Sequence, residues 1–202
     1  MHHQTEDLST TRDKILETAL KLFSKEGYLG ATTREIAKEA GIAEVTLFRY
    51  FPSKENLFEQ TINKYSFLPQ LRGLLPEIMD IPYESALKAV AERFLDTLML
   101  RKDCIRIMNS EIQRYPEKIH KTYLAFLDEV YRTIASYFSA MQKKGVLRNF
   151  DTEFAARAFF GMFFSYFNVE ELLMRRKYRK STDLDKRIID AFVDIFAKGT
   201  VK

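Results

Sequence analysis

The apolar residues of this chain recur every three or four positions over most of its length, which is the period of an amphipathic α-helix. The strict alternation of apolar and polar residues that is typical of a half-buried strand does not appear. Near the N-terminus the periodic pattern predicts a first helix, which starts at a cap formed by Thr10 and Asp13 and ends at Gly27. The pattern therefore predicts an all-α protein.

Three further helical signals follow closely. The Thr32-x-x-Glu35 pair is a capping box that opens a second helix, and Gly41 ends it. A third, short helix is predicted over residues 43–50, and a fourth starts at Ser53. Two short helices around a turn of about three residues, with glycine in the turn, have the spacing of a helix-turn-helix.

Residues 66–82 interrupt the helical period. Pro69, Gly73, Pro76 and Pro82 lie here, and each is unfavourable inside a helix, so we expect a connector, with a short extension of the preceding helix at its start as the alternative. The connector divides the chain into a domain of residues 1–65 and a domain of residues 66–202. The second domain is predicted to contain five helices, over about 83–101, 104–115, 117–144, 152–176 and 183–198, which gives about nine helices in all.

The helix-turn-helix segment has the chemistry that DNA recognition requires. An apolar set can hold its two helices at a fixed crossing: Ile36, Ala37, Ala40, Ile42, Leu47 and Phe51. The remaining side chains can reach bases in the major groove or phosphates. We therefore predict a DNA-binding set that consists of Thr33, Arg34, Glu44, Val45, Thr46, Arg49, Tyr50 and Lys54.

Four stretches in this segment form one specific pattern: TTREIA at 32–37, AGI at 40–42, TLFRYF at 46–51 and PSKE at 52–55. With these four motifs, the segment resembles the DNA-binding domain of the tetracycline-repressor (TetR/AcrR) family. The resemblance covers some 50 residues from about Thr11. The resemblance implies a dimer on a pseudo-palindromic operator, with a second, helical domain for dimerisation and ligand binding. A ligand bound there would weaken the binding of DNA.

The sequence departs from the usual family pattern at the recognition helix. Ala43 stands where serine is usual and cannot cap the helix through its side chain. Glu44 could accept from a cytosine amino group or simply favour the helix dipole, and Val45 could pack on a thymine methyl group. Phe48 replaces a frequent tyrosine, and we expect it in the core. For Lys54, a solvated charge at a helix start is the alternative to phosphate binding.

The predicted helix over 152–176 carries aromatic and methionine side chains in nearly every direction, so it is expected to be covered on more than one side. Small residues at spacings of three and four would permit close approach of a second subunit, although a core helix of a monomer is the alternative. The predicted dimer interface consists of Ala158, Phe160, Gly161, Phe164, Ser165, Ile188, Phe192 and Ile195. Apolar residues at inward positions suit an apolar, acyl or aromatic ligand, although plain core is the favoured alternative for each single residue. These ligand candidates are Phe94, Leu98, Met108, Ile112, Tyr123, Phe126 and Phe163.

The charges and the single cysteine limit how the protein can bind DNA and which covalent links it can form. The 202 residues contain 32 Lys and Arg against 28 Asp and Glu, a net charge of +4. Residues 1–64 contain nine basic and ten acidic residues, so DNA binding should depend on a few placed contacts and show a modest salt dependence. The basic run at 175–180 is interpreted as a solvated loop. Cys104 is the only cysteine, which excludes an intrachain disulfide, and we expect a buried, inert thiol.

The chain contains no signal for a metal site or a cofactor. It has no apolar run of the roughly 18 residues that a membrane span needs and no secretory signal, so a cytoplasmic location is expected. The helix-turn-helix and the resemblance to the TetR/AcrR family together imply a dimeric, ligand-responsive transcriptional repressor. A ligand-dependent activator is the alternative within regulators. An all-helical enzyme acting on an apolar substrate lacks a phosphate loop, nucleophile elbow or acid–base pair, and a helical protein-interaction module is a third possibility.

Overall fold

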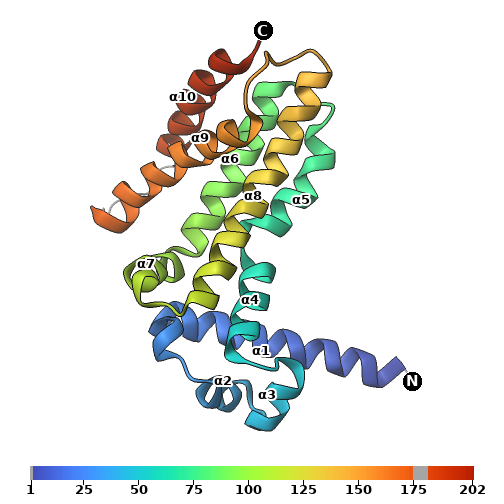
Figure 1. The fold of residues 1–202 in the computed structure, drawn as a ribbon, viewed down its shortest axis with the longest axis vertical. Coiled ribbons are helices and arrows are strands. Elements are labelled where there is room, and N and C mark those ends of the chain that lie inside the picture. The colour runs from blue at the N-terminus through green and yellow to red at the C-terminus, as the bar shows by residue number, and fades with distance from the viewer. Residues whose placement is uncertain (1, 175–181) are drawn as a thin grey trace. The chain divides into compact units, whose positions relative to one another are not determined.

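The computed structural model describes the backbone of residues 2–174 and 182–202 and the side chains of residues 10–174 and 186–202. The part of the chain that it describes forms helices α1–α10, and its β pairing is a single isolated bridge between Leu147 and Val201 (Figure 1). The prediction of an all-α protein is confirmed. The basic run at 175–180 lies outside the described residues.

The chain folds as two compact units. Unit 1 consists of the residues up to Tyr65 together with Arg101–Phe126, and unit 2 consists of Ser66–Leu100 together with the residues from Leu127 onward. Unit 1 therefore contains a segment that lies beyond position 65 in the sequence.

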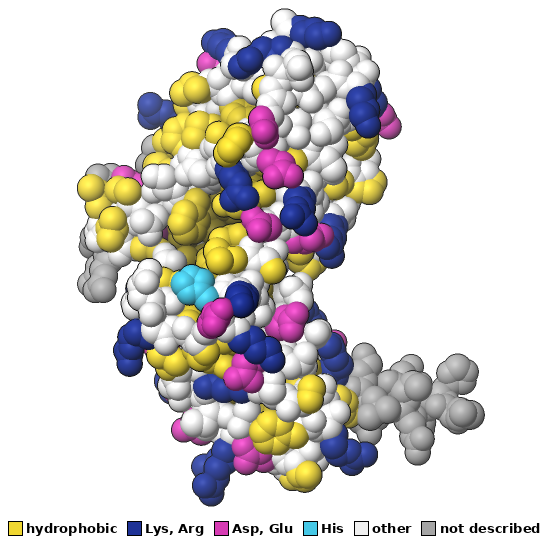
Figure 2. All heavy atoms as spheres, in the orientation of Figure 1, with side chains coloured by type: hydrophobic (Ala, Val, Ile, Leu, Met, Phe, Trp, Pro, Cys, Tyr) yellow, Lys and Arg dark blue, Asp and Glu magenta, His cyan; other side chains and the backbone are white. Residues whose placement is uncertain are grey.

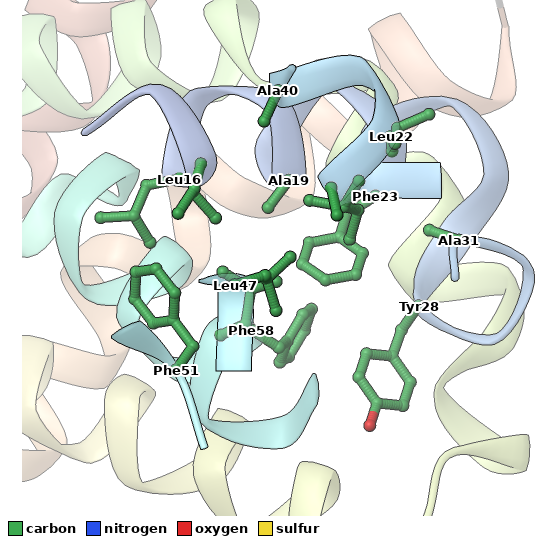
Figure 3. Packing of buried hydrophobic residues seen from close by; sticks show 14 of the residues in the cluster. Leu16, Ala19, Leu22, Phe23, Tyr28, Ala31, Ala40, Leu47, Phe51 and Phe58 are labelled. Carbon is green, nitrogen blue, oxygen red and sulfur yellow. The ribbon is translucent and has the colours of Figure 1, made fainter. Parts of the chain in front are cut away.

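Unit 1 contains α1 (His2–Gly30), α2 (Thr33–Ala40), α3 (Glu44–Tyr50), α4 (Lys54–Tyr65), α7 (Lys102–Glu111) and the first part of α8 (Glu117–Lys143). The inward faces of α1 to α4 meet in one apolar core, in which Leu47 and Phe51 approach Leu16 and Phe58 (Figure 3). Met108 of α7, Ile119 of α8 and Tyr115, which lies between these two helices, complete this core. The two short helices α2 and α3 are thus fixed by burial rather than by their own length.

The first helix differs from its predicted start. The sequence predicts a start at the Thr10–Asp13 cap, but α1 is already helical from His2, so this prediction is wrong. A capping pattern can occur inside a helix, since Thr and Asp there need only point to solvent. The predicted break at Gly27 is confirmed, because that residue has φ 76° and ψ 173° within α1.

Unit 2 contains α5 (Phe67–Ile78), α6 (Tyr83–Leu100), the rest of α8, α9 (Thr152–Phe167), a π-helical segment (Asn168–Leu173) and α10 (Thr182–Thr200). The backbone N–H groups of Glu153 and Phe154 donate to the side chain of Asp151, which caps α9. Buried aromatic side chains dominate the core of this unit, namely Tyr137, Phe138, Phe159, Phe163 and Phe167.

The connector predicted over 66–82 is wrong for most of its length, because α5 occupies Phe67–Ile78. Ser66 caps this helix, which places Pro69 in the first turn, where the missing N–H group has no partner to lose. Pro76 lies inside the helix near its end. An apolar face that includes Leu71 and Leu74 is buried, and this burial offsets the unfavourable residues.

Candidate nucleic-acid interface

The pair α2 and α3 is held by local capping and by a shared core. The N–H of Glu35 donates to Thr32 Oγ1 at 3.1 Å, and the N–H of Thr32 donates to Glu35 Oε2 at 3.1 Å, so the predicted capping box is present. Gly41 ends α2 with φ 70°, the left-handed conformation that glycine adopts without strain. The apolar set predicted to hold the two helices is buried except for Ile42, which is partly buried. The scaffold expected from the sequence is therefore formed.

The side of α3 opposite Leu47 faces solvent. Val45 is 70% exposed, Arg49 is exposed, and Thr46 and Tyr50 are half-buried. Phe48 is 42% exposed, so its predicted place in the core is wrong. Leu47 of α3 and Phe51, the C-cap residue after the helix, are buried, and Phe48 lies three residues from Val45 on the outer side. A helix face with an apolar part and a cationic part suits base edges and phosphates in a major groove.

Two of the predicted DNA contacts are bonded to each other. The hydroxyl of Thr33, at the start of α2, donates to Glu44 Oε1 at the start of α3, with 2.7 Å between the oxygens. This bond ties the two helices together at their N-terminal ends. It also satisfies one carboxylate oxygen of Glu44, which leaves the other oxygen as the acceptor for a base or water.

Lys54 and Arg34 are the other predicted cations of this surface. Arg34 is exposed on α2. Lys54 is half-buried at the start of α4, with its ammonium 4.5 Å from the centroid of the Tyr28 ring. Burial lowers the pKa of Lys54, and the carboxylates of Glu55, Glu111 and Glu35 oppose that shift. The hydroxyl of Tyr28 in turn donates to Glu55 at 3.2 Å.

The surface of unit 1 carries charges of both signs. On the face shown in Figure 2, Lys and Arg side chains are interspersed with Asp and Glu side chains over the lower part of the molecule, which contains α1 to α4 in Figure 1. Elsewhere in unit 1, Lys21 pairs with Glu39 and Lys64 pairs with Asp13. On the face shown, positive charge is therefore presented at single positions rather than as a broad basic field.

The ligand candidates do not lie in one unit. Phe94, Leu98 and Phe163 are buried in unit 2, where the Phe94 ring lies 5.1 Å from Phe67 and 4.7 Å from Phe160. Met108 is buried in the core of unit 1, and Ile112 and Tyr123 pack against that core. Phe126, the last residue assigned to unit 1, lies 6.3 Å from the Tyr123 ring.

The candidates for a dimer interface lie on α9 and α10. Most of them are accessible: Ala158, Gly161 and Ser165 are exposed, Ile195 is 62% exposed, and Phe164, Ile188 and Phe192 are partly buried. Phe160 is buried, with its ring against Phe94. A Cβ atom added at Gly161 would meet nothing within 4 Å. The two helices thus present small and apolar residues to the outside.

Other candidate chemistry is sparse in the described residues. Cys104 is partly buried, burial raises the pKa of its thiol, and its Sγ lies 3.8 Å from Met108 Sδ. Within residues 2–174 and 182–202, no group of three or more His, Cys, Asp or Glu residues could hold a metal ion. No helix in the same ranges combines the length and the apolar character that crossing a membrane demands.

Sequence reasoning missed two residues of this region. Phe48 has a sequence signal, since it lies three positions after Val45 on a helix whose inward positions are already filled. Glu111 has none, because it comes close to Gly27 only through the packing of α7 on α1.

Comparison with known families covers both units. Residues 15–61 match the model of the bacterial regulatory proteins of the tetR family. Residues 85–199, more than half of the chain, match the model of the C-terminal domain of AefR-like transcriptional repressors.

Individual proteins show the same likeness. YvkB of Bacillus subtilis (strain 168), an uncharacterized HTH-type transcriptional regulator, is 29% identical over 157 residues, which are 78% of this chain and 81% of YvkB. A protein of Mesorhizobium loti MAFF303099, assigned to the TetR family, has a similar fold with a TM-score of 0.80 and 23% identity over 96% of this chain and 98% of the other. The regulator FadR of Bacillus subtilis, solved in complex with stearoyl-CoA, gives a TM-score of 0.73 at 17% identity over 92% and 97% of the two chains.

Proposed function

Because this chain belongs to the TetR family of bacterial regulatory proteins, we propose that it is a ligand-responsive repressor that binds a pseudo-palindromic operator as a dimer. The observation that carries the proposal is the solvent-facing side of α3, where Val45, Phe48 and Arg49 project from a capped and buried scaffold. In a dimer, two copies of α3 would enter successive major grooves about 34–36 Å apart. A regulator of chromosomal genes acts in the cytoplasm.

The contacts of α3 divide into two chemical kinds. Arg49 can donate to guanine O6 and N7 or to phosphate, and Thr46 and Tyr50 offer hydroxyl groups. Val45 and Phe48 can pack on thymine methyl groups, since both are exposed and apolar. Glu44, held by Thr33, keeps one oxygen for a cytosine or adenine amino group. Arg34 and Lys54 would meet phosphates from the helices on either side.

The proposed dimer uses α9 and α10 of each subunit. The exposed small residues Ala158, Gly161 and Ser165 recur every three or four positions on α9, so a second helix could approach closely there. Ile195, exposed on α10, would be covered in the same contact. Four helices, two from each subunit, would form the interface.

The proposed ligand is apolar, with an acyl or aromatic part, and would bind in unit 2. Phe94, Leu98 and Phe163 support this assignment, because they line the inward sides of α6 and α9. FadR offers a precedent, since a protein of similar fold holds stearoyl-CoA. Met108, Ile112 and Tyr123 pack with the core of unit 1, so they support a ligand site in unit 2 less than Phe94, Leu98 and Phe163 do. Release of DNA requires that the ligand prefers a state of the dimer that binds the operator poorly.

Selection of sequences from random duplex DNA, followed by titration of the selected operator, tests the proposal. Arg49→Ala should weaken operator binding about fivefold to 100-fold, because a well-placed arginine contributes about 1–3 kcal/mol of discrimination. Arg132→Ala is the matched control, since Arg132 is exposed on α8 in unit 2, and it should change affinity less than twofold. Acyl-CoA thioesters of increasing chain length, added to the complex, should release the DNA. Recovery of no preferred sequence, or full affinity in Arg49→Ala, would contradict the proposal.

A further inference from the structure

The hydrogen bond between Thr33 and Glu44 joins the first residue of α2 to the first residue of α3. Its oxygen–oxygen distance of 2.7 Å is typical of a strong bond from a hydroxyl group to a carboxylate. Both side chains are half-buried. A hydroxyl group has a single proton to donate, so the proton that Thr33 gives to Glu44 is not free for a phosphate.

The backbone on either side of this bond is fixed as well. The capping box at Thr32 fixes the start of α2, directly before Thr33. In the turn that leads to Glu44, the N–H of Ile42 donates to the carbonyl oxygen of Ala37 at 3.0 Å. Because the backbone and one carboxylate oxygen of Glu44 are both held, the second oxygen keeps one direction relative to α3.

Glu44 lies where a recognition helix reaches the bases, since the N-terminal residues of such a helix contact base edges in the major groove. It also lies one turn before the exposed side chain of Phe48. An ionised carboxylate only accepts hydrogen bonds. In the major groove the donors are the amino groups of cytosine and adenine, whereas guanine and thymine present acceptors. Adenine carries its N7 acceptor beside the amino group, which repels a carboxylate, so cytosine is the better partner.

We propose that Thr33 is a positioning residue that holds Glu44 toward the amino group of a cytosine, at one C·G pair in each half of the operator. This inference rests on the proposed function, in which α3 enters the major groove. Each subunit contributes one Glu44, so the twofold symmetry of a dimer gives one such pair in each half-site. Thymine in the place of the cytosine would turn an acceptor toward the carboxylate, so the held charge also rejects the wrong base.

The experiment selects sequences from random duplex DNA with the full-length protein and then titrates single-base changes of the selected operator. The wild type should show one C·G position in each half-site where replacement weakens binding about fivefold to 100-fold, the usual cost of one mismatched pair. Thr33→Val keeps the shape of the side chain without the hydroxyl, and it should reduce this preference to less than about threefold. Thr33→Ser keeps the hydroxyl and should retain the preference for cytosine.

Glu44→Gln tests whether the side chain is held. Its amide oxygen can still accept from Thr33, which turns the NH2 group toward the base. The selected cytosine should then change to thymine, whose O4 acceptor stands where cytosine has its amino group. A freely rotating amide would instead contact the N6 and N7 atoms of adenine together, so a change to adenine would overturn the role of Thr33. This outcome does not depend on the folding of Thr33→Val.

Two controls separate positioning from general support of the fold. In a Glu44→Ala background, Thr33→Val should no longer alter the preference at this pair. Thr122→Val removes a hydroxyl that donates to the Lys118 carbonyl within α8 at 3.0 Å, and it should leave every base preference unchanged.

An equal loss of affinity for all sequences in Thr33→Val, with the cytosine preference intact, would overturn the inference. So would an operator in which no position responds to Glu44→Gln. Both results leave the proposed function intact, because the wild type still selects an operator. Failure of the wild type to select any sequence would instead overturn the proposed function and this inference together.

Discussion

Gly27 has φ 76° and ψ 173°, a conformation that residues with a Cβ atom rarely adopt, and the Glu111 carboxylate occupies the space a Cβ would need. Gly27→Ala should therefore lower the free energy of unfolding by about 1–3 kcal/mol or more, through backbone strain and displacement of Glu111. Urea unfolding, followed by circular dichroism, measures the change.

Gly73→Ala is the matched control for that prediction. Gly73 lies inside α5, and a Cβ atom there would meet nothing within 4 Å. Alanine should stabilise this helix by up to about 1 kcal/mol, because glycine loses more backbone freedom on folding. Equal effects of the two substitutions would show that the conformation of Gly27 is not strained for alanine.

Helix α3 carries most of the proposed DNA contacts, yet its start is weakly fixed. Ala43 is the N-cap residue and makes no side-chain hydrogen bond to the helix. Ala43→Ser should add such a bond and stabilise the protein by about 0.5–1.5 kcal/mol, the usual contribution of a serine cap. The shift in the urea midpoint tests this expectation.

Asp151→Ala is the converse test, because it removes an N-cap side chain from α9 instead of adding one to α3. The Asp151 carboxylate accepts from the N–H groups of Glu153 and Phe154 at 2.9 and 3.0 Å, so its removal should cost about 1 kcal/mol. If Ala43→Ser does not stabilise while Asp151→Ala destabilises, the N–H groups at the start of α3 already have adequate partners.

The sequence predicts the elements whose signals are local. The capping box at Thr32 and the left-handed Gly41 determine the bounds of α2 through residues a few positions apart, and both are confirmed. The existence of α5 could not be predicted in this way. Its prolines argue against a helix, whereas the burial of Leu71 and Leu74 depends on partners elsewhere in unit 2.

In the candidate interface, too, local features could be predicted from the sequence and those that depend on distant contacts could not. The apolar scaffold of α2 and α3 follows from helical spacing, and the same spacing places Phe48 on the side of Val45, away from Leu47. The position of Glu111 depends on contact between α7 and α1, about 80 residues apart in the chain, and no periodic pattern reports it. Which of the predicted residues contact DNA, ligand or a second subunit stays a prediction.

On the scale of the whole molecule, the proposed dimer can be tested by placing a charge in its interface. Ile195→Glu would place a charge in the proposed contact of α9 and α10, where Ile195 is now 62% exposed. Burial of an unpaired carboxylate costs several kcal/mol, so the dimer dissociation constant should rise by about 100-fold or more. Sedimentation equilibrium over a range of concentrations measures it.

Leu124→Glu is the control for the dimer. Leu124 is 51% exposed on the part of α8 that belongs to unit 1, away from α9 and α10 in the sequence. It should leave the mass of the assembly unchanged. A dimer that persists in Ile195→Glu, or one that Leu124→Glu disrupts, would place the interface elsewhere.

The discontinuity of unit 1 has a consequence for synthesis of the chain. The core around α1 to α4 includes Met108, Tyr115 and Ile119, which a ribosome adds only after all of Ser66–Leu100. At roughly 5–20 residues per second, Ile119 follows Tyr65 by about 3 to 10 seconds. During that interval the nascent helix-turn-helix lacks part of its own core. The DNA-binding helices are therefore fully supported only after α5, α6 and α7 have been made, which delays their competence for DNA until the first segment of unit 2, Ser66–Leu100, exists.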